Sequence, residues 1–186
     1  LSALRQFYCW TEVTLFYPNI ARSVKAPRMK KGFQKAPLSV EQVAQLMAYL
    51  KDKSLRNYAI VNLIIRTGLR TIEVSRLDVK DIVFRRGKRV LLVWGKGMTS
   101  KDSIVILNDK AWDPIKAYLA TRKAVKDTDP LFVTEGKGHR GARLSTRSLQ
   151  DICKQALRAI GLDSHEYSAH SLRHTTGVWI LKSGGD

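Results

Sequence analysis

Four basic side chains lie in three short motifs whose chemistry suits a phosphate group. The motifs are TGLRTIEV (67–74), WGKG (94–97) and HSLRH (170–174), and the side chains are Arg70, Lys96, His170 and Arg173. Two arginines can hold one phosphate through paired hydrogen bonds. A lysine and a histidine can move protons to and from its oxygens. The set therefore predicts metal-free phosphoryl transfer, with DNA as the substrate.

Arg70 is supported by its neighbours in the sequence. Gly68 is typical of a helix end, so Arg70 follows a helix terminus. A further helix is expected from Thr71, and the unpaired backbone N–H groups at a helix N-terminus attract phosphate. Glu73 lies three residues further on and can hold the guanidinium from the same helical face. We therefore predict that Arg70 is catalytic and that Glu73 supports it.

His170 and Arg173 follow Ser168, a residue type that favours a helix N-terminus. Helical spacing puts both on one face, where they can point at one phosphate. His174 shares this side, and we expect it to be a buried supporting side chain. A zinc site on the two histidines is disfavoured, because it needs a third ligand and neither cysteine is placed to provide one. We predict no metal and no other cofactor.

Lys96 lies at the tip of a predicted strand–turn–strand unit. A hairpin of this kind can carry an ammonium group into the minor groove, toward the bond to be cut. An ordinary polar turn is the simpler interpretation, since lysines flanked by glycines are common. Lys101 is the alternative lysine in the same turn.

A GxGxxG pattern at 136–141 offers a different interpretation, a dinucleotide-binding turn. Such a site also needs a βαβ unit and an acidic residue about 20 positions further on. Here the surroundings are basic, and the helices that follow lead to no parallel strand. We read residues 136–143 as a basic loop.

The composition points to a polyanionic partner. Among 186 residues, 33 are Lys or Arg and 16 are Asp or Glu, which gives a formal net charge of +17. Such an excess is typical of nucleic-acid binding, and we predict double-stranded DNA as the partner. A basic membrane-binding surface is the alternative, but it usually takes the form of one amphipathic helix. No apolar run approaches the ~20 residues of a membrane span.

Cys9 and Cys153 are far apart in the sequence and lack CxxC spacing. We expect both to be reduced core residues of a cytoplasmic protein. The N-terminus has neither a signal-peptide pattern nor an initiator Met, so we expect the chain to be an excised piece.

The chain divides into three predicted parts. Residues 1–20 carry apolar side chains at helical spacing, residues 21–37 form a linker rich in Lys, Arg, Pro and Gly, and residues 38–186 form the main domain. Basic residues of the linker, together with Lys101, are predicted to contact DNA: Arg22, Lys25, Arg28, Lys30, Lys31 and Lys35.

The main domain is predicted to be α+β and mainly α. Helices are expected at about 40–51, 55–67 and 71–77, the first capped by Ser39 and Gln42. Alternating patterns at 81–84, 90–94 and 104–107 predict a small three-stranded antiparallel sheet. Helices resume at about 110–124, 145–160 and 169–183.

Together, the three motifs resemble those of the tyrosine recombinases of the phage-integrase family, including the Xer-type resolvases. TGLR with Glu73 resembles the first arginine box, GKG the β-hairpin lysine, and HSLRH the HxLRH box. The motifs stand in the family's order. Residues 1–20 resemble the last helix of the family's N-terminal core-binding domain, truncated, and residues 38–186 its catalytic domain.

The resemblance implies site-specific recombination that integrates or excises a mobile element such as a phage or transposon. Arg70 and Arg173 would stabilise the scissile phosphate, His170 would act in acid–base transfer, and Lys96 would protonate the leaving 5′ oxygen. A tyrosine would attack to form a 3′-phosphotyrosine, with self-association as a tetramer on DNA. That tyrosine follows HxLRH in the family, so we expect it beyond Asp186 and the catalytic domain to be C-terminally incomplete.

Two alternatives stay open at this point. A non-catalytic DNA-binding module could keep the fold as a basic clamp. A type IB topoisomerase would use similar chemistry.

Overall fold

The computed structural model of the chain describes residues 2–25, 35–95, 100–136 and 140–182. The chain separates into two compact units, residues 1–34 and residues 35–186. Within the described residues, no helix is long and apolar enough to cross a bilayer.

The first unit contains helix α1 (Ser2–Thr14). Its larger apolar side chains are mostly exposed, among them Phe7 and Trp10. Cys9 is exposed as well, so the expectation that it is a core residue is wrong, because this short unit buries few side chains. Cys153, in the second unit, is fully buried as expected, and burial raises the pKa of its thiol to about 12.

The second unit opens with two helices whose ends follow from local sequence. Helix α2 (Val40–Lys53) begins at the predicted capping box of Ser39 and Gln42. Helix α3 (Leu55–Thr67) ends at Gly68, whose φ of 67° is left-handed and therefore suits glycine. A short helix, α4 (Thr71–Ser75), follows directly.

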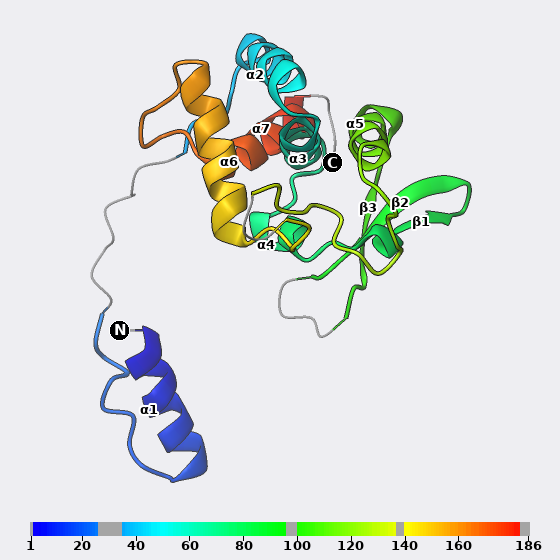
Figure 1. The fold of residues 1–186 in the computed structure, drawn as a ribbon. Coiled ribbons are helices and arrows are strands. Elements are labelled where there is room, and N and C mark those ends of the chain that lie inside the picture. The colour runs from blue at the N-terminus through cyan, green and yellow to red at the C-terminus, as the bar shows by residue number, and fades with distance from the viewer. Residues whose placement is uncertain (1, 26–34, 96–99, 137–139, 183–186) are drawn as a thin grey trace. The chain divides into compact units, whose positions relative to one another are not determined.

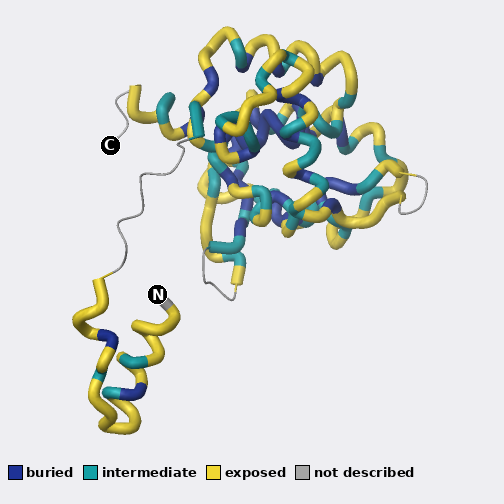
Figure 2. The backbone as a smooth tube through the Cα atoms, turned by 90° about the vertical axis from the view of Figure 1, so that its left-hand side faces the viewer, coloured by how far each residue is buried: buried dark blue, intermediate teal, exposed yellow. Residues whose placement is uncertain are grey.

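Helix α3 forms the centre of this unit. Residues 59–65 are buried without interruption, so the helix is covered on every side. The polar member of this run, Asn62, donates from Nδ2 to the carbonyl oxygen of Lys110 at 2.9 Å. The buried backbone in Figure 2 accordingly lies in the middle of the unit. Elements that contact α3 share this core, including α2, α5 and α7.

The predicted meander is present as a three-stranded antiparallel sheet in the order β1-β2-β3. A 3₁₀ turn (Val79–Asp81) leads into β1 (Ile82–Arg85), which pairs with β2 (Lys88–Val93), which in turn pairs with β3 (Ser103–Ile106). Val90 is a partner of both Val83 and Ile106. Leu91 points to the other side and is fully buried in the core.

Three further helices complete the unit: α5 (Asp109–Ala120), α6 (Thr146–Ala159) and α7 (Ala169–Lys182). Figure 1 shows α2, α3, α6 and α7 grouped together, with α5 beside the sheet. The predicted fold class, mainly helical with a small antiparallel sheet, is confirmed.

Candidate active site

Arg70 is held by Glu73 through two contacts. One carboxylate oxygen accepts from the Arg70 backbone N–H at 2.7 Å, and the other accepts from Nη1 of its guanidinium at 2.7 Å. The Glu73 side chain is only 11% exposed, whereas that of Arg70 is 46% exposed. The carboxylate therefore fixes both the backbone and the guanidinium of Arg70, while the side chain stays accessible to a ligand.

Helix α7 divides into a buried and an exposed side. Its buried residues are Ala169, Ser171, Leu172, Thr175 and Thr176. His170 and His174 are exposed, and Arg173 is half-buried. The expectation that His174 is buried is therefore wrong. It shares its side of the helix with His170, as its spacing predicts, but that side faces away from the core.

Contacts of α7 with the rest of the unit bring two predicted site segments together. Thr176 donates to the carbonyl oxygen of Ile65, near the end of α3, at 2.7 Å. A β-carbon on Gly68 would stand 3.5 Å from the methyl group of Thr176. Arg173 lies three residues before Thr176, about 4.5 Å along the helix axis. Arg70 lies two residues beyond Gly68. The two arginines thus come from directly adjoining segments.

The loop before α7 is fastened by a lysine that sequence reasoning missed. Nζ of Lys154 on α6 donates to the carbonyl oxygens of Asp163 and Ser164, both at 2.9 Å, and of Tyr167 at 3.3 Å. These contacts match the three donors of an ammonium group. Because the loop leads straight into α7, Lys154 fixes the approach to His170. Nothing near Lys154 in the sequence marks it among the other basic residues.

Ser168 and Ser171 add local support to the start of α7. The backbone N–H of His170 donates to Oγ of Ser168 at 3.3 Å. The hydroxyl of Ser171, fully buried, donates to the carbonyl oxygen of Glu166 at 2.6 Å. The backbone that carries His170 is therefore tied to the preceding loop at several points.

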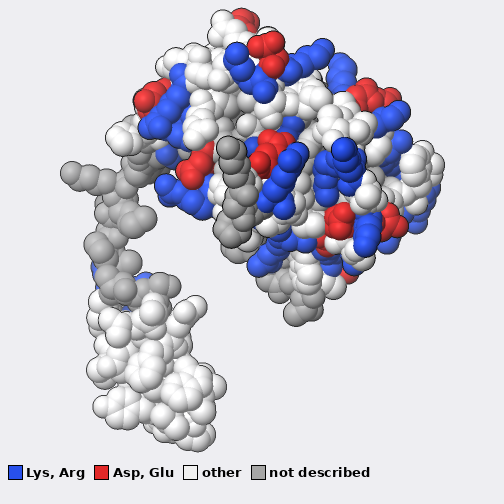
Figure 3. Space-filling view, viewed as in Figure 1, with Lys and Arg blue, Asp and Glu red and all other residues white. Residues whose placement is uncertain are grey.

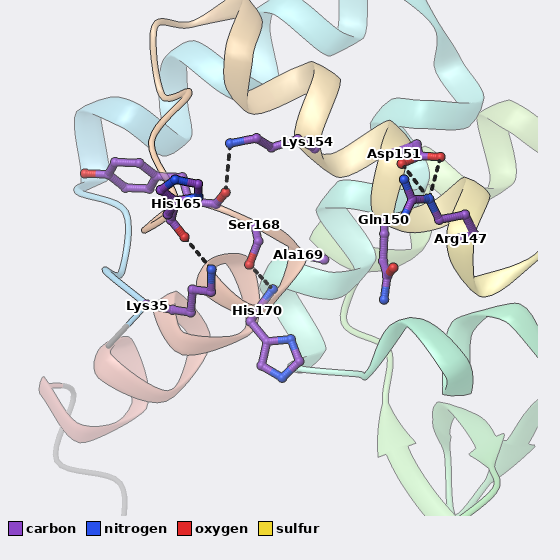
Figure 4. Close-up of a pocket in the computed structure, with 10 residues that line it drawn as sticks. Lys35, Arg147, Gln150, Asp151, Lys154, His165, Ser168, Ala169 and His170 are labelled. Atoms are coloured by element: carbon purple, nitrogen blue, oxygen red, sulfur yellow. Dashed lines mark hydrogen bonds and ion pairs between the residues drawn. The ribbon is translucent and has the colours of Figure 1, made fainter. Parts of the chain in front are cut away.

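A cavity of about 320 Å³ opens beside His170 (Figure 4). Its walls come from the chain before α2, from α6, from the loop after α6 and from the start of α7. The residues that line it are mostly basic or polar: Lys35, Arg147, Gln150, Asp151, Lys154, His165, Tyr167, Ser168, Ala169 and His170.

Lys96 lies outside the described residues, so its predicted role stays a prediction. Lys101, the alternative lysine, is described and forms ion pairs with Asp78, at 3.0 Å, and with Asp81. Its side chain is 17% exposed. The ammonium group of Lys101 is therefore engaged with carboxylates of the protein.

Asp78 accepts from a second cation, because Nη2 of Arg143 also pairs with its carboxylate. Partial burial works to raise the pKa of Asp78, but the hydrogen bonds and charges of Arg143 and Lys101 outweigh it and hold that pKa below its usual value. Arg143 also donates from Nη1 to the carbonyl oxygen of Leu77 at 2.9 Å. The cluster thus joins the loop after α4, the loop before β3 and the loop before α6.

The residues predicted to contact DNA occupy varied positions. Arg22 is exposed in the first unit and pairs with Glu12 at 2.9 Å, and Lys25 is exposed nearby in the sequence. Lys35 is half-buried at the start of the second unit, where Nζ donates to the carbonyl oxygen of His165. Arg28, Lys30 and Lys31 fall outside the described ranges.

Two tyrosines of the second unit are packed or hydrogen-bonded. Tyr118 is buried on α5, where its hydroxyl accepts from the backbone N–H of Val133 at 3.3 Å, and burial raises its pKa. Tyr167 is half-buried and packs against the hydrophobic core. We assign Tyr167 to packing, because it precedes the HSLRH motif, whereas the nucleophile of the family follows that motif.

A family model described as the phage integrase family matches residues 37–186. The chain belongs to the phage integrase family. The resemblance drawn from the three motifs is thereby confirmed, and the match covers the whole described second unit apart from its first residues. The tyrosine recombinase XerC of Actinobacillus pleuropneumoniae serotype 7 is 33% identical over 190 residues, covering 100% of this chain and 59% of that relative. The chain thus spans about three fifths of this relative's length.

Solved structures of family members share the fold. The crystal structure of XerA recombinase matches with a TM-score of 0.68 at 22% identity, over 100% of this chain and 70% of that chain. A lambda integrase dimer bound to a COC′ core site matches with a TM-score of 0.67 at 14% identity, over 98% of this chain and 65% of that chain. At these identities the likeness establishes the architecture, a tyrosine-recombinase catalytic domain.

Proposed function

We propose that this chain forms part of a tyrosine-type site-specific recombinase, in which residues 38–186 bind the DNA and its scissile phosphate. One observation carries the proposal: Glu73 fixes Arg70 beside the segment on which α7 docks, and α7 bears His170 and Arg173. Family membership and the order of the motifs support the same function. The biological outcome would be integration or excision of a mobile element.

The chemistry follows from the charges that this arrangement gathers. The guanidinium groups of Arg70 and Arg173 bind the non-bridging oxygens of the phosphate, and stabilise the negative charge that grows in the transition state. A tyrosine oxygen bonds to phosphorus, the bond to the 5′ oxygen breaks, and Lys96 supplies the proton that this oxygen takes up. His170 holds or transfers the proton of the attacking hydroxyl. Religation reverses the same steps.

Double-stranded DNA is the proposed partner, and the charge of the chain supports it. The formal net charge is +17, and Figure 3 shows Lys and Arg side chains over the visible face of the second unit, with Asp and Glu between them. The lambda integrase structure is of a dimer on its DNA site. Exchange between two duplexes cuts four strands, so we also propose self-association on DNA, with one site for each cut.

Binding to duplex DNA and to a single anion tests the proposal. Arg70→Ala should weaken duplex binding measured by fluorescence anisotropy, by about 10-fold for one charged contact of ~1.4 kcal/mol. Arg85→Ala, which removes an exposed arginine from β1, is the matched control and should have a smaller effect. In crystals soaked with sulfate, the anion should lie between Arg70 and Arg173. Equal effects of the two variants, with no anion at the arginines, would refute the site.

A nicked suicide duplex tests the assignment of the nucleophile. None of the six tyrosines follows the HSLRH motif, so this chain alone should form no covalent band on a denaturing gel. A covalent band that disappears in Tyr167→Phe would show that the packing role given to Tyr167 is wrong. Relaxation of supercoiled DNA without a sequence requirement would instead favour a type IB topoisomerase.

A further inference from the structure

The cavity beside His170 has the composition of an anion site that the scissile-phosphate chemistry does not use. Three cationic side chains and two imidazoles line it, and the carboxylate that lines it, Asp151, is paired with Arg147 at 3.2 Å. These groups come from four separate segments of the chain. The tertiary fold therefore brings these groups together around one cavity, and no single helix end supplies them all.

The walls of this cavity are fixed before any ligand arrives. Nζ of Lys154 donates to three backbone carbonyl oxygens of the loop after α6. Lys35 binds the carbonyl oxygen of His165 on the same loop. Because these lysines hold the loop, His165, Ser168 and His170 keep their places around the opening, and binding would need little ordering of the protein.

Arg147 and Gln150 also line the cavity, and both have hydrogen-bond donors that a ligand can use. Arg147 pairs with Asp151 through Nε. Within the part of the chain that the structure describes, the two terminal nitrogens of its guanidinium therefore remain available to a ligand. The Arg147 side chain is 83% exposed, and Gln150, one turn along α6, is exposed too. A guanidinium and an amide on one side of a basic hollow are suited to the oxygens of a phosphodiester.

The position of the cavity indicates that DNA would supply this phosphodiester. His170 lines it, and His170 also belongs to the proposed scissile site. Along one strand of a duplex, phosphates recur about every 3.4 Å of helix axis. Arg173 lies three residues after His170 on α7, about one helical turn. A strand with one phosphate between Arg70 and Arg173 would therefore bring a neighbouring phosphate close to the cavity.

We propose that the cavity binds a second phosphate of the DNA backbone, with Arg147, Gln150 and Lys35 as donors. The inference rests on the proposed function, since it takes the DNA at the scissile site as given. Its effect would be to fix the strand on both sides of His170, so that the imidazole meets the scissile phosphate in one orientation.

Salt-dependent binding of a generic duplex tests the inference. Each phosphate contact contributes about 0.9 to the slope of log affinity against log salt. Arg147→Gln should reduce the slope by about 1 and weaken binding. Arg85→Gln removes the same charge from an exposed site outside the cavity and should change the slope less. Equal changes in both variants would show a general charge effect and overturn the proposal.

A second pair of variants leaves the net charge unchanged. Gln150 and Gln155 are both exposed on α6, but Gln150 alone of the two lines the cavity. Gln150→Ala should weaken duplex binding severalfold, while Gln155→Ala should not. Combined with Arg70→Ala, Arg147→Gln should weaken binding by the product of the single effects, because the two residues hold different phosphates. An effect of Gln155→Ala as large as that of Gln150→Ala, or a double variant no weaker than Arg70→Ala, would overturn the inference.

The same measurements separate this inference from the proposed function. Duplex binding that needs Arg70 but ignores Arg147 and Gln150 would overturn the second site alone. Titration with inorganic phosphate, followed by the amide NMR signals of Gln150 and Ala169, identifies the source of the anion. Saturation at micromolar free phosphate without duplex binding would contradict the DNA proposal and both roles built on it.

Discussion

The hydroxyl of Thr176 donates to the carbonyl oxygen of Ile65 at 2.7 Å, and its methyl group packs against Gly68. This pair sets the register of α7 against the end of α3. Since Arg173 lies before Thr176 and Arg70 follows Gly68, the same contact sets the register of the two arginines. A packing contact of the core thus sets how the two arginines of the proposed phosphate site lie relative to each other.

Thr176→Val should therefore weaken both stability and phosphate binding. Valine keeps the shape of threonine but leaves the carbonyl oxygen of Ile65 without this donor, at a cost of about 1 kcal/mol in the free energy of unfolding. Urea denaturation measures the loss. Thr121→Val, at an exposed position at the end of α5, should cost less. Equal costs would contradict the importance assigned to the Thr176 contact.

Glu73→Gln separates two effects on DNA binding: the loss of the contact that supports Arg70, and the loss of one negative charge. The change removes a negative charge, which by itself favours DNA binding. Loss of the charge-assisted contact to the guanidinium should nevertheless weaken duplex binding, by about 3- to 10-fold for ~0.7–1.4 kcal/mol. Glu41→Gln removes the same charge from a fully exposed site on α2, and should leave binding unchanged or slightly stronger. Parallel behaviour of the two variants in fluorescence anisotropy would argue against the support role.

Lys154→Met should free the loop that leads into His170. Three backbone carbonyls lose their shared donor, and we expect the free energy of unfolding to fall by about 1–3 kcal/mol. Amide hydrogen exchange over residues 163–168 should accelerate more than that in α3. Lys116→Met, an exposed lysine on α5, serves as the control. Unchanged exchange in this loop would contradict the fastening role.

Asp78→Asn should alter how stability depends on pH. Partial burial works to raise the pKa of Asp78, but Arg143 and Lys101 hold its folded-state pKa below the ordinary value for an aspartate. The ionised form therefore stabilises the fold above that ordinary pKa. This contribution is lost as the pH falls through the folded pKa. Wild type should exceed the variant in stability at pH 7, and the difference should shrink below about pH 4 as the carboxyl takes up its proton. Asp52→Asn changes a side chain that is 79% exposed, and should show little difference at any pH.

Local signals predicted most of the fold. The ends of α2 and α3 depend on Ser39, Gln42 and Gly68, whose capping chemistry acts within a few residues. The strands of the meander show as alternation over short windows, and the structure has them within two residues of the predicted bounds. Family motifs supplied the proposed catalytic set, because their order along the chain is itself informative.

Features that depend on tertiary contacts could not be predicted in the same way. The carbonyl partners of Lys154 lie 9 to 13 residues away, on a loop without a motif. The carboxylate partners of Lys101 lie 20 and 23 residues away. Helical spacing showed that His174 shares a side with His170, but not which side of α7 faces the core. That choice is made by the packing of Thr175 and Thr176.

The backbone N–H of Leu38 donates to the hydroxyl of Thr175 at 2.9 Å, across 137 residues of chain. Contacts of such sequence separation form late, because a long loop must close before they contribute. During synthesis the chain emerges from its N-terminus, so the sheet and the helices up to α6 are made before α7 leaves the ribosome. The proposed phosphate site therefore forms in a fixed order. It needs both Arg70 and Arg173, so a growing chain cannot hold a phosphate between them until α7 docks against the end of α3.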